Sequence, residues 1–214
     1  MKITLLCSDP NHPVNAFLEA WLSAQQGIHE VELLRSKSQL SGGDLLFLVS
    51  CSEIIEESDR NQFLATLVLH ASDLPKGRGW SPHIWEIAAG ANHINLSLLE
   101  AEDRLDTGKI WEKRQISIPK DALWDEINHL LFSAEIDLLD LAVKQFGQQK
   151  ADQQDESEIP TYYPKRTLSD GRLDPDKTIS EQFDQIRVCD PNRFPAFFEL
   201  RGSKYKLFLE KLDE

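Results

Sequence analysis

Residues 66–82 have the sequence Thr66-Leu-Val-Leu-His-Ala-Ser-Asp-Leu-Pro-Lys-Gly-Arg-Gly-Trp-Ser-Pro82. The first part is apolar up to His70 and is typical of a buried strand, whereas two prolines and two glycines break the second part into a loop. In open α/β sheets, ligands bind at the carboxyl ends of the strands. We therefore expect His70 at a ligand-binding edge. A second turn, Leu105-Asp-Thr-Gly108, places Asp106 36 residues after His70, so a carboxylate is expected to meet the imidazole there.

The residues before this stretch predict one half of a Rossmann-like sheet. Short apolar runs at 3–7 and 31–34 predict two strands, and residues 14–25 between them have apolar side chains at helical spacing. Residues 44–50 are almost continuously apolar, which is typical of a parallel strand covered on both faces. This alternation predicts an α/β fold. No Gly-x-Gly-x-x-Gly follows the first strand, so the sequence does not support a dinucleotide cofactor.

Further elements are predicted from capping residues and periodicity. In chain order they are a short helix at 52–57 capped by Ser52, a helix at 82–89, strands at 94–100 and 110–118, and a helix of about seven turns from Asp121. The polar run that follows has no large apolar side chain, which predicts a flexible acidic linker at 148–159. We therefore predict a catalytic domain at 1–147 and a small C-terminal subdomain at 160–214. The subdomain is predicted to hold a helix capped by Thr178 and a β-hairpin that turns at Arg201-Gly-Ser203.

The charge balance and the cysteines exclude several classes of function. The 214 residues include 23 Lys and Arg against 36 Asp and Glu, a net charge of −13, which argues against a nucleic-acid partner. No apolar run approaches the ~20 residues of a membrane span, and the first segment is too short for a signal peptide. We therefore expect a cytoplasmic protein without a membrane partner. Three widely spaced cysteines and scattered histidines predict buried free thiols and no metal site.

The segment His70–Pro82, followed by Leu105-Asp-Thr-Gly108, resembles the signature of the folate-dependent formyltransferases, which include methionyl-tRNA and nucleotide-sugar formyltransferases. Weaker similarity extends to 51–55, 163–166, 186–191 and 195–198. The sequence looks most similar to short sugar N-formyltransferases of the pseudaminic-acid-pathway type. The resemblance implies a Rossmann-like formyltransferase domain, 10-formyltetrahydrofolate as cosubstrate, and an amino sugar as acceptor in surface polysaccharide biosynthesis.

The resemblance also implies the site residues. The hallmark of the family is Asn-x-His with a distant Asp, which corresponds to His70 and Asp106, but the Asn position is occupied by Val68. Either another donor replaces this amide, with Asn92, Asn95, Ser97 and backbone N–H groups as candidates, or catalysis is weaker. The loop positions that approach folate in the family correspond to Ser72, Leu74, Pro75, Lys76, Arg78 and Gly79.

Formyl transfer needs an oxyanion donor, a proton acceptor and two reactants held together. The imidazole of His70 suits donation to the oxyanion and proton relay, because its ordinary pKa is ~6.5. The carboxylate of Asp106 suits orienting that imidazole and accepting the proton of the amine. Loss of an oxyanion donor at position 68 is worth ~2.7–4 kcal/mol by analogy with other oxyanion holes.

The acceptor and the class of protein leave alternatives open. Methionyl-tRNA formyltransferases carry a further C-terminal barrel and basic surfaces, whereas this acidic chain ends at Glu214, so we expect a small amino sugar. Trp80 and Trp85 are candidates to stack on it. The rivals are a non-catalytic binding protein of the same fold and a phosphoribosylglycinamide-type formyltransferase. The aromatic C-terminal end also raises the prediction of a homodimer.

Overall fold

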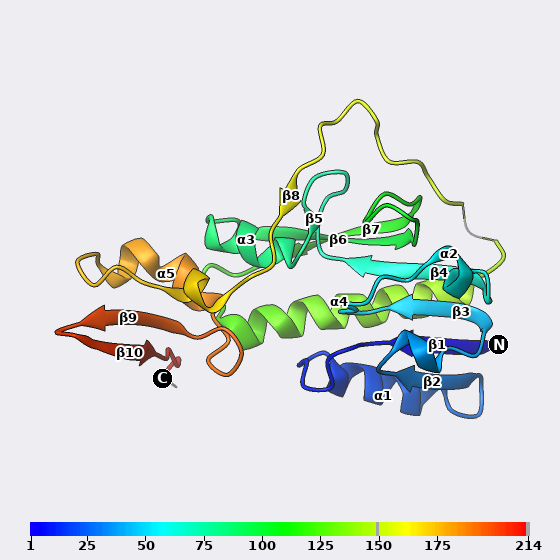
Figure 1. The fold of residues 1–214 in the computed structure, drawn as a ribbon, viewed down its shortest axis with the longest axis horizontal. Helices are drawn as coiled ribbons and strands as arrows, with labels where there is room; N and C mark the ends of the chain where they lie inside the picture. Colours follow the sequence, from blue (N-terminus) through cyan, green and yellow to red (C-terminus); the bar gives the residue numbers. More distant parts are fainter. Residues whose placement is uncertain (149, 213–214) are drawn as a thin grey trace.

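The computed structural model describes residues 1–148 and 150–212, and its centre is a six-stranded sheet (Figure 1). The strands are ordered β2-β1-β3-β4-β6-β7. The first four run parallel, β6 pairs antiparallel with β4, and β7 pairs antiparallel with β6. Their bounds are β1 (Lys2–Leu6), β2 (Glu30–Leu34), β3 (Gly43–Leu48), β4 (Phe63–His70), β6 (His93–Glu100) and β7 (Ile110–Ser117). The predicted α/β, Rossmann-like fold is therefore confirmed.

The two faces of the sheet are covered by different parts of the chain. Successive side chains of a strand point to opposite faces. On one face, alternate residues such as Leu5, Phe47 and Leu69 pack against helices α1 (Asn15–Gln25) and α4 (Trp124–Gln145) in the main hydrophobic core. The side chains between them pack in a smaller cluster with the loop around Ile55. The carboxyl edge of β1, β3 and β4 is thus open between a helical layer and a layer of loops.

The predicted short helix at 52–57 is wrong. Residues 51–56 form a loop, and helix α2 covers only Glu57–Arg60. The backbone N–H of Ser52 donates to Ser8 Oγ (2.8 Å), and the carboxylate of Glu53 accepts from the backbone N–H of Lys37 (2.6 Å). These bonds to distant loops outweigh the local capping preference of Ser52. The remaining short elements are η1 (Lys37–Gln39), β5 (Arg78–Gly79), α3 (Pro82–Ala88), β8 (Tyr162–Tyr163) and η2 (Leu168–Gly171).

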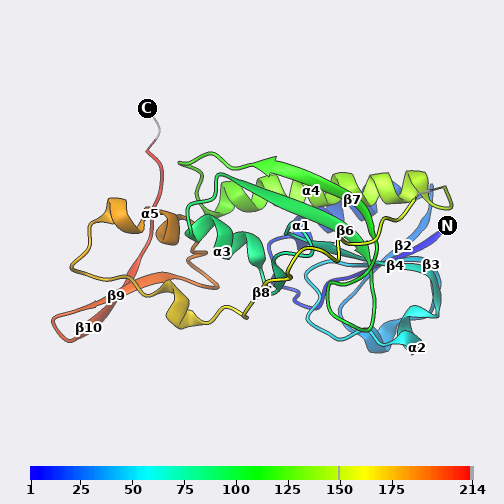
Figure 2. The same cartoon turned by 90° about the horizontal axis from the view of Figure 1, so that it is seen from above.

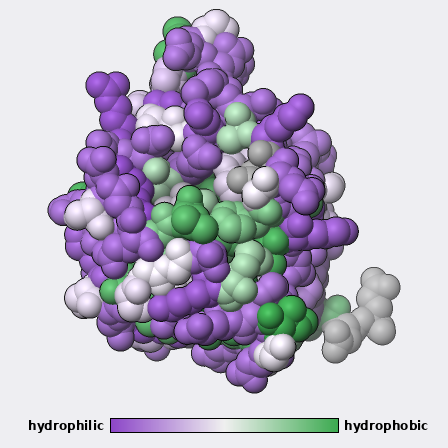
Figure 3. All heavy atoms as spheres, turned by 90° about the vertical axis from the view of Figure 1, so that its right-hand side faces the viewer, coloured by the Kyte–Doolittle hydropathy of each residue, from purple (hydrophilic) through white to green (hydrophobic). Residues whose placement is uncertain are grey.

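The C-terminal part forms the helix and hairpin that the sequence predicts. Helix α5 (Ile179–Arg187) begins at Thr178, whose hydroxyl accepts from the backbone N–H of Glu181, and β9 (Ala196–Leu200) pairs with β10 (Ser203–Leu207). Both residues of the hairpin turn have positive φ, which favours glycine at the second of them, Gly202. Figures 1 and 2 show α5 and the hairpin at one end of the molecule, beyond the sheet. The opposite end, seen in Figure 3, presents mostly hydrophilic residues around a small hydrophobic patch.

One buried cation joins this part to the main domain. Arg187, at the end of α5, is only 2% exposed. Its guanidinium pairs with Asp184 (2.7 Å) and donates to the backbone carbonyls of Pro119 (3.1 Å), Ala122 (3.4 Å) and Ala91 (3.4 Å). These carbonyls belong to the segments that flank β6 and β7. The small cluster under the hairpin, formed by Leu173, Ile186, Cys189 and Ala196, is therefore held against the sheet domain through α5.

The segment after α4 makes contacts that the sequence did not predict. Asp152 and Ile110 exchange two backbone hydrogen bonds of 2.8 Å, and Gln154 is buried. Figure 1 shows this segment arching from the end of α4 to β8. The predicted linker 148–159 and subdomain 160–214 remain predictions as units. They include residues 149 and 213–214, which lie outside the described residues.

None of the helices described between residues 1 and 212 is long and apolar enough to span a membrane.

Candidate active site

His70 ends strand β4 with its ring almost buried. Its Nε2 lies 2.8 Å from the carbonyl oxygen of Gly77, in the loop that follows the strand. Because a carbonyl oxygen only accepts, Nε2 must carry a proton in this arrangement. The second ring nitrogen, Nδ1, therefore decides whether the imidazole is neutral or charged, and it faces Asp106.

Asp106 occupies a turn that brings its carboxylate between His70 and the glycine loop. Its Oδ1 lies 3.6 Å from His70 Nδ1, and its Oδ2 accepts a 2.9 Å hydrogen bond from the backbone N–H of Gly79. Asp106 has φ of 56°, a left-handed conformation that Asp and Asn tolerate better than most residues. A Cβ at Gly108 would collide with the carbonyl of Glu100, so this tight turn requires glycine there. The structure thus brings together the two residues predicted as the catalytic pair.

The glycine loop is fixed to the segment that follows the predicted linker. The backbone N–H of Gly77 donates to Thr161 Oγ1 (2.8 Å), and β5 pairs in parallel with β8. Gly79 has φ of 97°, and a Cβ there would collide with the carbonyl of Tyr163. Glycine is therefore required at this close approach of two chains. The loop is positioned by residues about 80 positions further along the sequence.

The other predicted folate-loop residues lie in the loop or beneath it, and the described lining of the cavity does not include them. Of the six, only Gly79 is among the described residues that line the cavity. Ser72, Leu74 and Pro75 are buried beneath the loop. The ammonium of Lys76 pairs with Glu158 (2.9 Å), and the guanidinium of Arg78 donates to Gln154 Oε1 (2.7 Å) and lies over the ring of Tyr162. Lys76 and Arg78 thus bond to the segment at 154–162, and the contact of these loop residues with folate stays a prediction.

The predicted substitutes for the family amide lie away from the cavity. The hydroxyl of Ser97 donates to the carbonyl of Ser72 (2.7 Å), so its hydrogen is already used within the protein. Asn95 pairs with Gln115 across β6 and β7, and Asn92 is exposed beside His93. None of the three lines the cavity among the described residues. Strand β6 lies on the far side of β4, which the sequence could not indicate.

A cavity of about 770 Å³ opens in front of His70 and Asp106, at the carboxyl ends of β1, β3 and β4. Side chains from both faces of the sheet line it. We call one side the loop wall, formed by the loop layer and by the strand residues beneath it: Leu48, Ser50–Ile55, Val68, Glu100–Asp103 and Leu105. We call the other side the helix wall, formed by the loop after β1, one face of α4 and the C-terminal segment: Asp9, His12, Ile127, Asn128, Leu131, Phe132, Glu135, Lys165, Arg166, Val188, Asp190 and Arg193.

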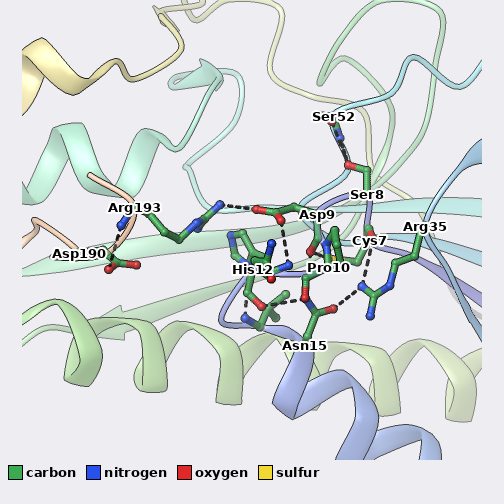
Figure 4. Close-up of polar contacts among 12 residues, drawn as sticks. Cys7, Ser8, Asp9, Pro10, His12, Asn15, Arg35, Ser52, Asp190 and Arg193 are labelled. Carbon is green, nitrogen blue, oxygen red and sulfur yellow. Dashed lines mark hydrogen bonds and ion pairs between the residues drawn. The ribbon is translucent and has the colours of Figure 1, made fainter. Parts of the chain in front are cut away.

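The loop after β1 is linked to the C-terminal segment across the cavity (Figure 4). The side-chain amide of Asn15 donates to the carbonyls of Asp9, Pro10 and His12, which folds this loop into a compact turn. Asp9 then pairs with the guanidinium of Arg193 (2.8 Å). Burial, and then Arg193, lower the pKa of His12 to about 4, so this ring is neutral at pH 7. Sequence reasoning missed this link because the two segments are more than 180 residues apart.

Two further ionisable groups in the cavity wall are shifted by burial. Burial, followed by the neighbouring His70, lowers the pKa of His83 to about 3, and its Nδ1 has no hydrogen-bond partner among the described residues. Burial alone raises the pKa of Glu135 to about 8.

The cations Lys165 and Arg166 lie over the rings of Trp80 and Phe194, at 4.7 and 5.0 Å from the centroids. Neither forms an ion pair with a carboxylate in the described part of the chain.

Known proteins are similar to this chain in sequence and in fold. The model of the formyl transferase family matches residues 4–143. A methionyl-tRNA formyltransferase from Desulfotalea psychrophila is 30% identical over 155 residues, which are 70% of this chain and 46% of that protein. The chain thus spans about half the length of this curated relative.

Two solved structures illustrate the similarity of the fold. A sugar N-formyltransferase from Shewanella sp FDAARGOS_354 is 17% identical with a TM-score of 0.72, and the match covers 100% of both chains. HypX from Aquifex aeolicus in complex with tetrahydrofolic acid is 22% identical with a TM-score of 0.78, over 98% of this chain and 37% of that one.

Proposed function

Because the chain belongs to the formyl transferase family, we propose that it transfers a formyl group from 10-formyltetrahydrofolate to the amine of an amino sugar. The observation that carries this proposal is the buried pair of His70 and Asp106 at the wall of a cavity that is large enough for two small molecules. The acceptor is a nucleotide-linked amino sugar or an amino precursor of a nonulosonic acid. Such a product would serve the synthesis of surface polysaccharides of the pseudaminic-acid type.

The hydrogen bonds of His70 and Asp106 limit where a proton can be gained or lost in the proposed reaction. With Nε2–H bound to the carbonyl of Gly77, the only nitrogen of His70 that gains or loses a proton without breaking this bond is Nδ1. A protonated Nδ1 would donate to the oxyanion that forms on the formyl carbon. Asp106, 3.6 Å away, would stabilise the imidazolium and take the proton that the attacking amine releases. The oxyanion would then re-form the carbonyl as the bond to the folate nitrogen breaks, and this proton would pass to that nitrogen, which leaves as tetrahydrofolate. The carboxylate is itself held by the Gly79 N–H, which keeps it aimed at the ring.

The two walls of the cavity suit two different molecules. The loop wall offers apolar side chains, including Leu48, Ile55 and Val68, next to backbone of the 50–55 loop. These features suit a flat pteridine, which needs apolar contact and a few hydrogen bonds. The helix wall offers charged and polar groups of both signs, which suit the hydroxyls and anionic groups of a sugar. We therefore place the folate against the loop wall and the acceptor against the helix wall.

The acceptor is the finer part of the proposal. Lys165, Arg166 and Arg193 are cations on the helix wall of a chain whose net charge is −13. A local cluster of this kind suits one phosphate or carboxylate group of a small molecule, whereas tRNA binding draws on many basic contacts. Methionyl-tRNA remains a second candidate acceptor, because the curated relative that is 30% identical is a methionyl-tRNA formyltransferase.

A substrate screen tests this proposal. Purified protein is mixed with 10-formyltetrahydrofolate and, in turn, with 3-amino and 4-amino nucleotide sugars, amino nonulosonic acids, glycinamide ribotide and methionyl-tRNA, and tetrahydrofolate release is followed. We expect turnover with an amino sugar only. Turnover with methionyl-tRNA or glycinamide ribotide would show that this molecule, and not an amino sugar, is the acceptor. Absence of both turnover and folate binding would favour a non-catalytic protein of this fold.

A homodimer and a cytoplasmic location stay predictions.

A further inference from the structure

Helix α4 presents one charged side chain on the face that it turns toward the core. Eight of its residues are buried, and seven of them are apolar: Ile127, Leu131, Phe132, Ala134, Leu138, Leu139 and Ala142. The eighth is Glu135, which is only 5% exposed. It follows Leu131 by one helical turn and so lies on the apolar face of the helix, where an apolar residue is expected. The core of the protein does not require a carboxyl group at this position.

Glu135 has no polar partner within the described part of the protein. Its carboxyl oxygens make no hydrogen bond and no ion pair with described residues, and Oε2 is fully buried. Burial raises the pKa of this carboxyl group to about 8, and no neighbouring cation opposes the shift. Buried polar groups normally have partners, because water can no longer satisfy them. A leucine would fill the same space without this cost.

The side chain of Glu135 lies at the cavity rather than in the sealed core. It lines the helix wall together with Asn128, which is two helical turns earlier on the same face. Seven residues of helix separate the two by ~10 Å. Asn128 also makes no side-chain hydrogen bond to the described residues, whereas Asp9 and His12 on the same wall are already bonded within the protein. Glu135 and Asn128 thus leave unused hydrogen-bonding capacity facing the space proposed for the acceptor.

We propose that Glu135 is a specificity-determining residue whose carboxyl group accepts a hydrogen bond from an O–H or N–H donor of the acceptor. This inference rests on the proposed function, because it needs an acceptor bound at the helix wall. A sugar fits it well, since it carries several hydroxyls, of which one can donate to Glu135 while another accepts from Asn128. The folate is assigned to the loop wall, opposite α4. The unsatisfied carboxyl group is then satisfied only in the complex, which favours acceptors that carry a donor at the matching position.

The test compares three variants with the wild-type protein. Glu135→Leu removes the acceptor of the hydrogen bond at similar volume, Glu135→Gln keeps an acceptor oxygen, and Glu19→Leu makes the same change at an exposed position of α1. Each is assayed with 10-formyltetrahydrofolate and with the 3-amino or 4-amino nucleotide sugar, or amino nonulosonic acid, that the wild type turns over fastest. The thermal midpoint, kcat and the KM for each cosubstrate are measured.

We expect Glu135→Leu to raise the KM for the amino sugar about tenfold or more, the effect of losing one hydrogen bond in a buried site. Its KM for 10-formyltetrahydrofolate should stay within twofold, and its thermal midpoint should rise, because an unsatisfied carboxyl group has been removed. Glu135→Gln should recover most of the loss, and Glu19→Leu should match the wild type. A thermal midpoint that rises while recognition of the amino sugar falls is not expected of a residue that only supports the helix.

Deoxy analogues of the amino sugar identify the bonded group. The analogue that lacks the bonded group should bind the wild type more weakly than the amino sugar does. It should bind Glu135→Leu as well as the amino sugar does, because the analogue and the substitution remove the same hydrogen bond. An unchanged KM for the amino sugar in Glu135→Leu would overturn this inference and leave the proposed function intact. A rise in the KM for folate instead would overturn it as well. Failure of the wild-type protein to use any amino sugar would overturn both.

Discussion

Replacement of Asp106 separates the chemical role of its carboxylate from its structural role. The two oxygens do different work: Oδ2 accepts from the Gly79 N–H at 2.9 Å, and Oδ1 faces His70 Nδ1 at 3.6 Å. Asp106→Asn keeps an oxygen for Gly79 and also tolerates φ of 56°. Asp106→Ala loses the acceptor and fits this backbone poorly. The two variants should therefore differ in stability and resemble each other in activity.

The expected magnitudes follow from these contacts. In Asp106→Ala, a partly buried N–H without an acceptor costs ~1–3 kcal/mol, and alanine in a left-handed conformation adds about 1 kcal/mol, so the free energy of unfolding should fall by ~2–4 kcal/mol. In Asp106→Asn it should change by less than about 1 kcal/mol. Both variants should lose at least ~10²-fold in kcat, since neither keeps a carboxylate that can stabilise the imidazolium or accept a proton. In Asp106→Asn the amide also donates to Nδ1, so His70 is held in a neutral form that cannot donate at Nδ1.

The assays are urea unfolding followed by circular dichroism, and tetrahydrofolate release with the acceptor found in the screen. His70→Ala is the matched variant for the partner side chain, and it should also lose at least ~10²-fold in kcat. The double variant His70→Ala/Asp106→Ala should be little slower than either single variant, because the two residues act as a unit. Near wild-type kcat for Asp106→Asn would refute the charge argument. Wild-type stability for Asp106→Ala would refute the structural role of the bond to Gly79.

Three other substitutions test the missing oxyanion donor, the contact of α5 with the main domain and the burial of His83. Val68→Asn should raise kcat by ~10-fold or more, because Val68 lines the cavity two residues before His70 and none of the other predicted side-chain donors lines this cavity. An unchanged or lower kcat would indicate that backbone N–H groups already donate to the oxyanion. Arg187→Met should lower the free energy of unfolding by ~3–5 kcal/mol in urea titrations, since it strips buried carbonyls of their donor, and a loss below about 1 kcal/mol would contradict this. His83, whose pKa falls from its ordinary value near 6.5 to about 3 on folding, takes up a proton on unfolding between these pH values, so stability is lost as the pH falls. His83→Phe should remove up to about 1.4 kcal/mol per pH unit of that slope, and an unaltered slope between pH 6.5 and 4 would show that His83 is not buried in its neutral form.

Much of the fold could be predicted from local pattern. Strand and helix periods are properties of neighbouring residues, so β1, β3, β4, α1, α4 and the C-terminal hairpin were predicted close to their observed bounds. The cap at Thr178 was also predicted, because its partner is three residues away. The helix at 52–57 failed for the opposite reason, since Ser52 and Glu53 bond to residues 8 and 37, which no local pattern reports.

For the site, the sequence alone could place His70 at the end of a strand and propose Asp106 as its partner through the resemblance to a family. It could not reveal that Lys76 and Arg78 are occupied by Glu158 and Gln154, or that Ser97 is bonded to the carbonyl of Ser72. Nor could it show that Glu135 reaches the cavity unsatisfied. Each of these facts depends on which distant segments are brought within ~3 Å of one another. Hydrogen bonding and desolvation act over that range, so the partner and the burial of a polar group are defined only once the chain has packed.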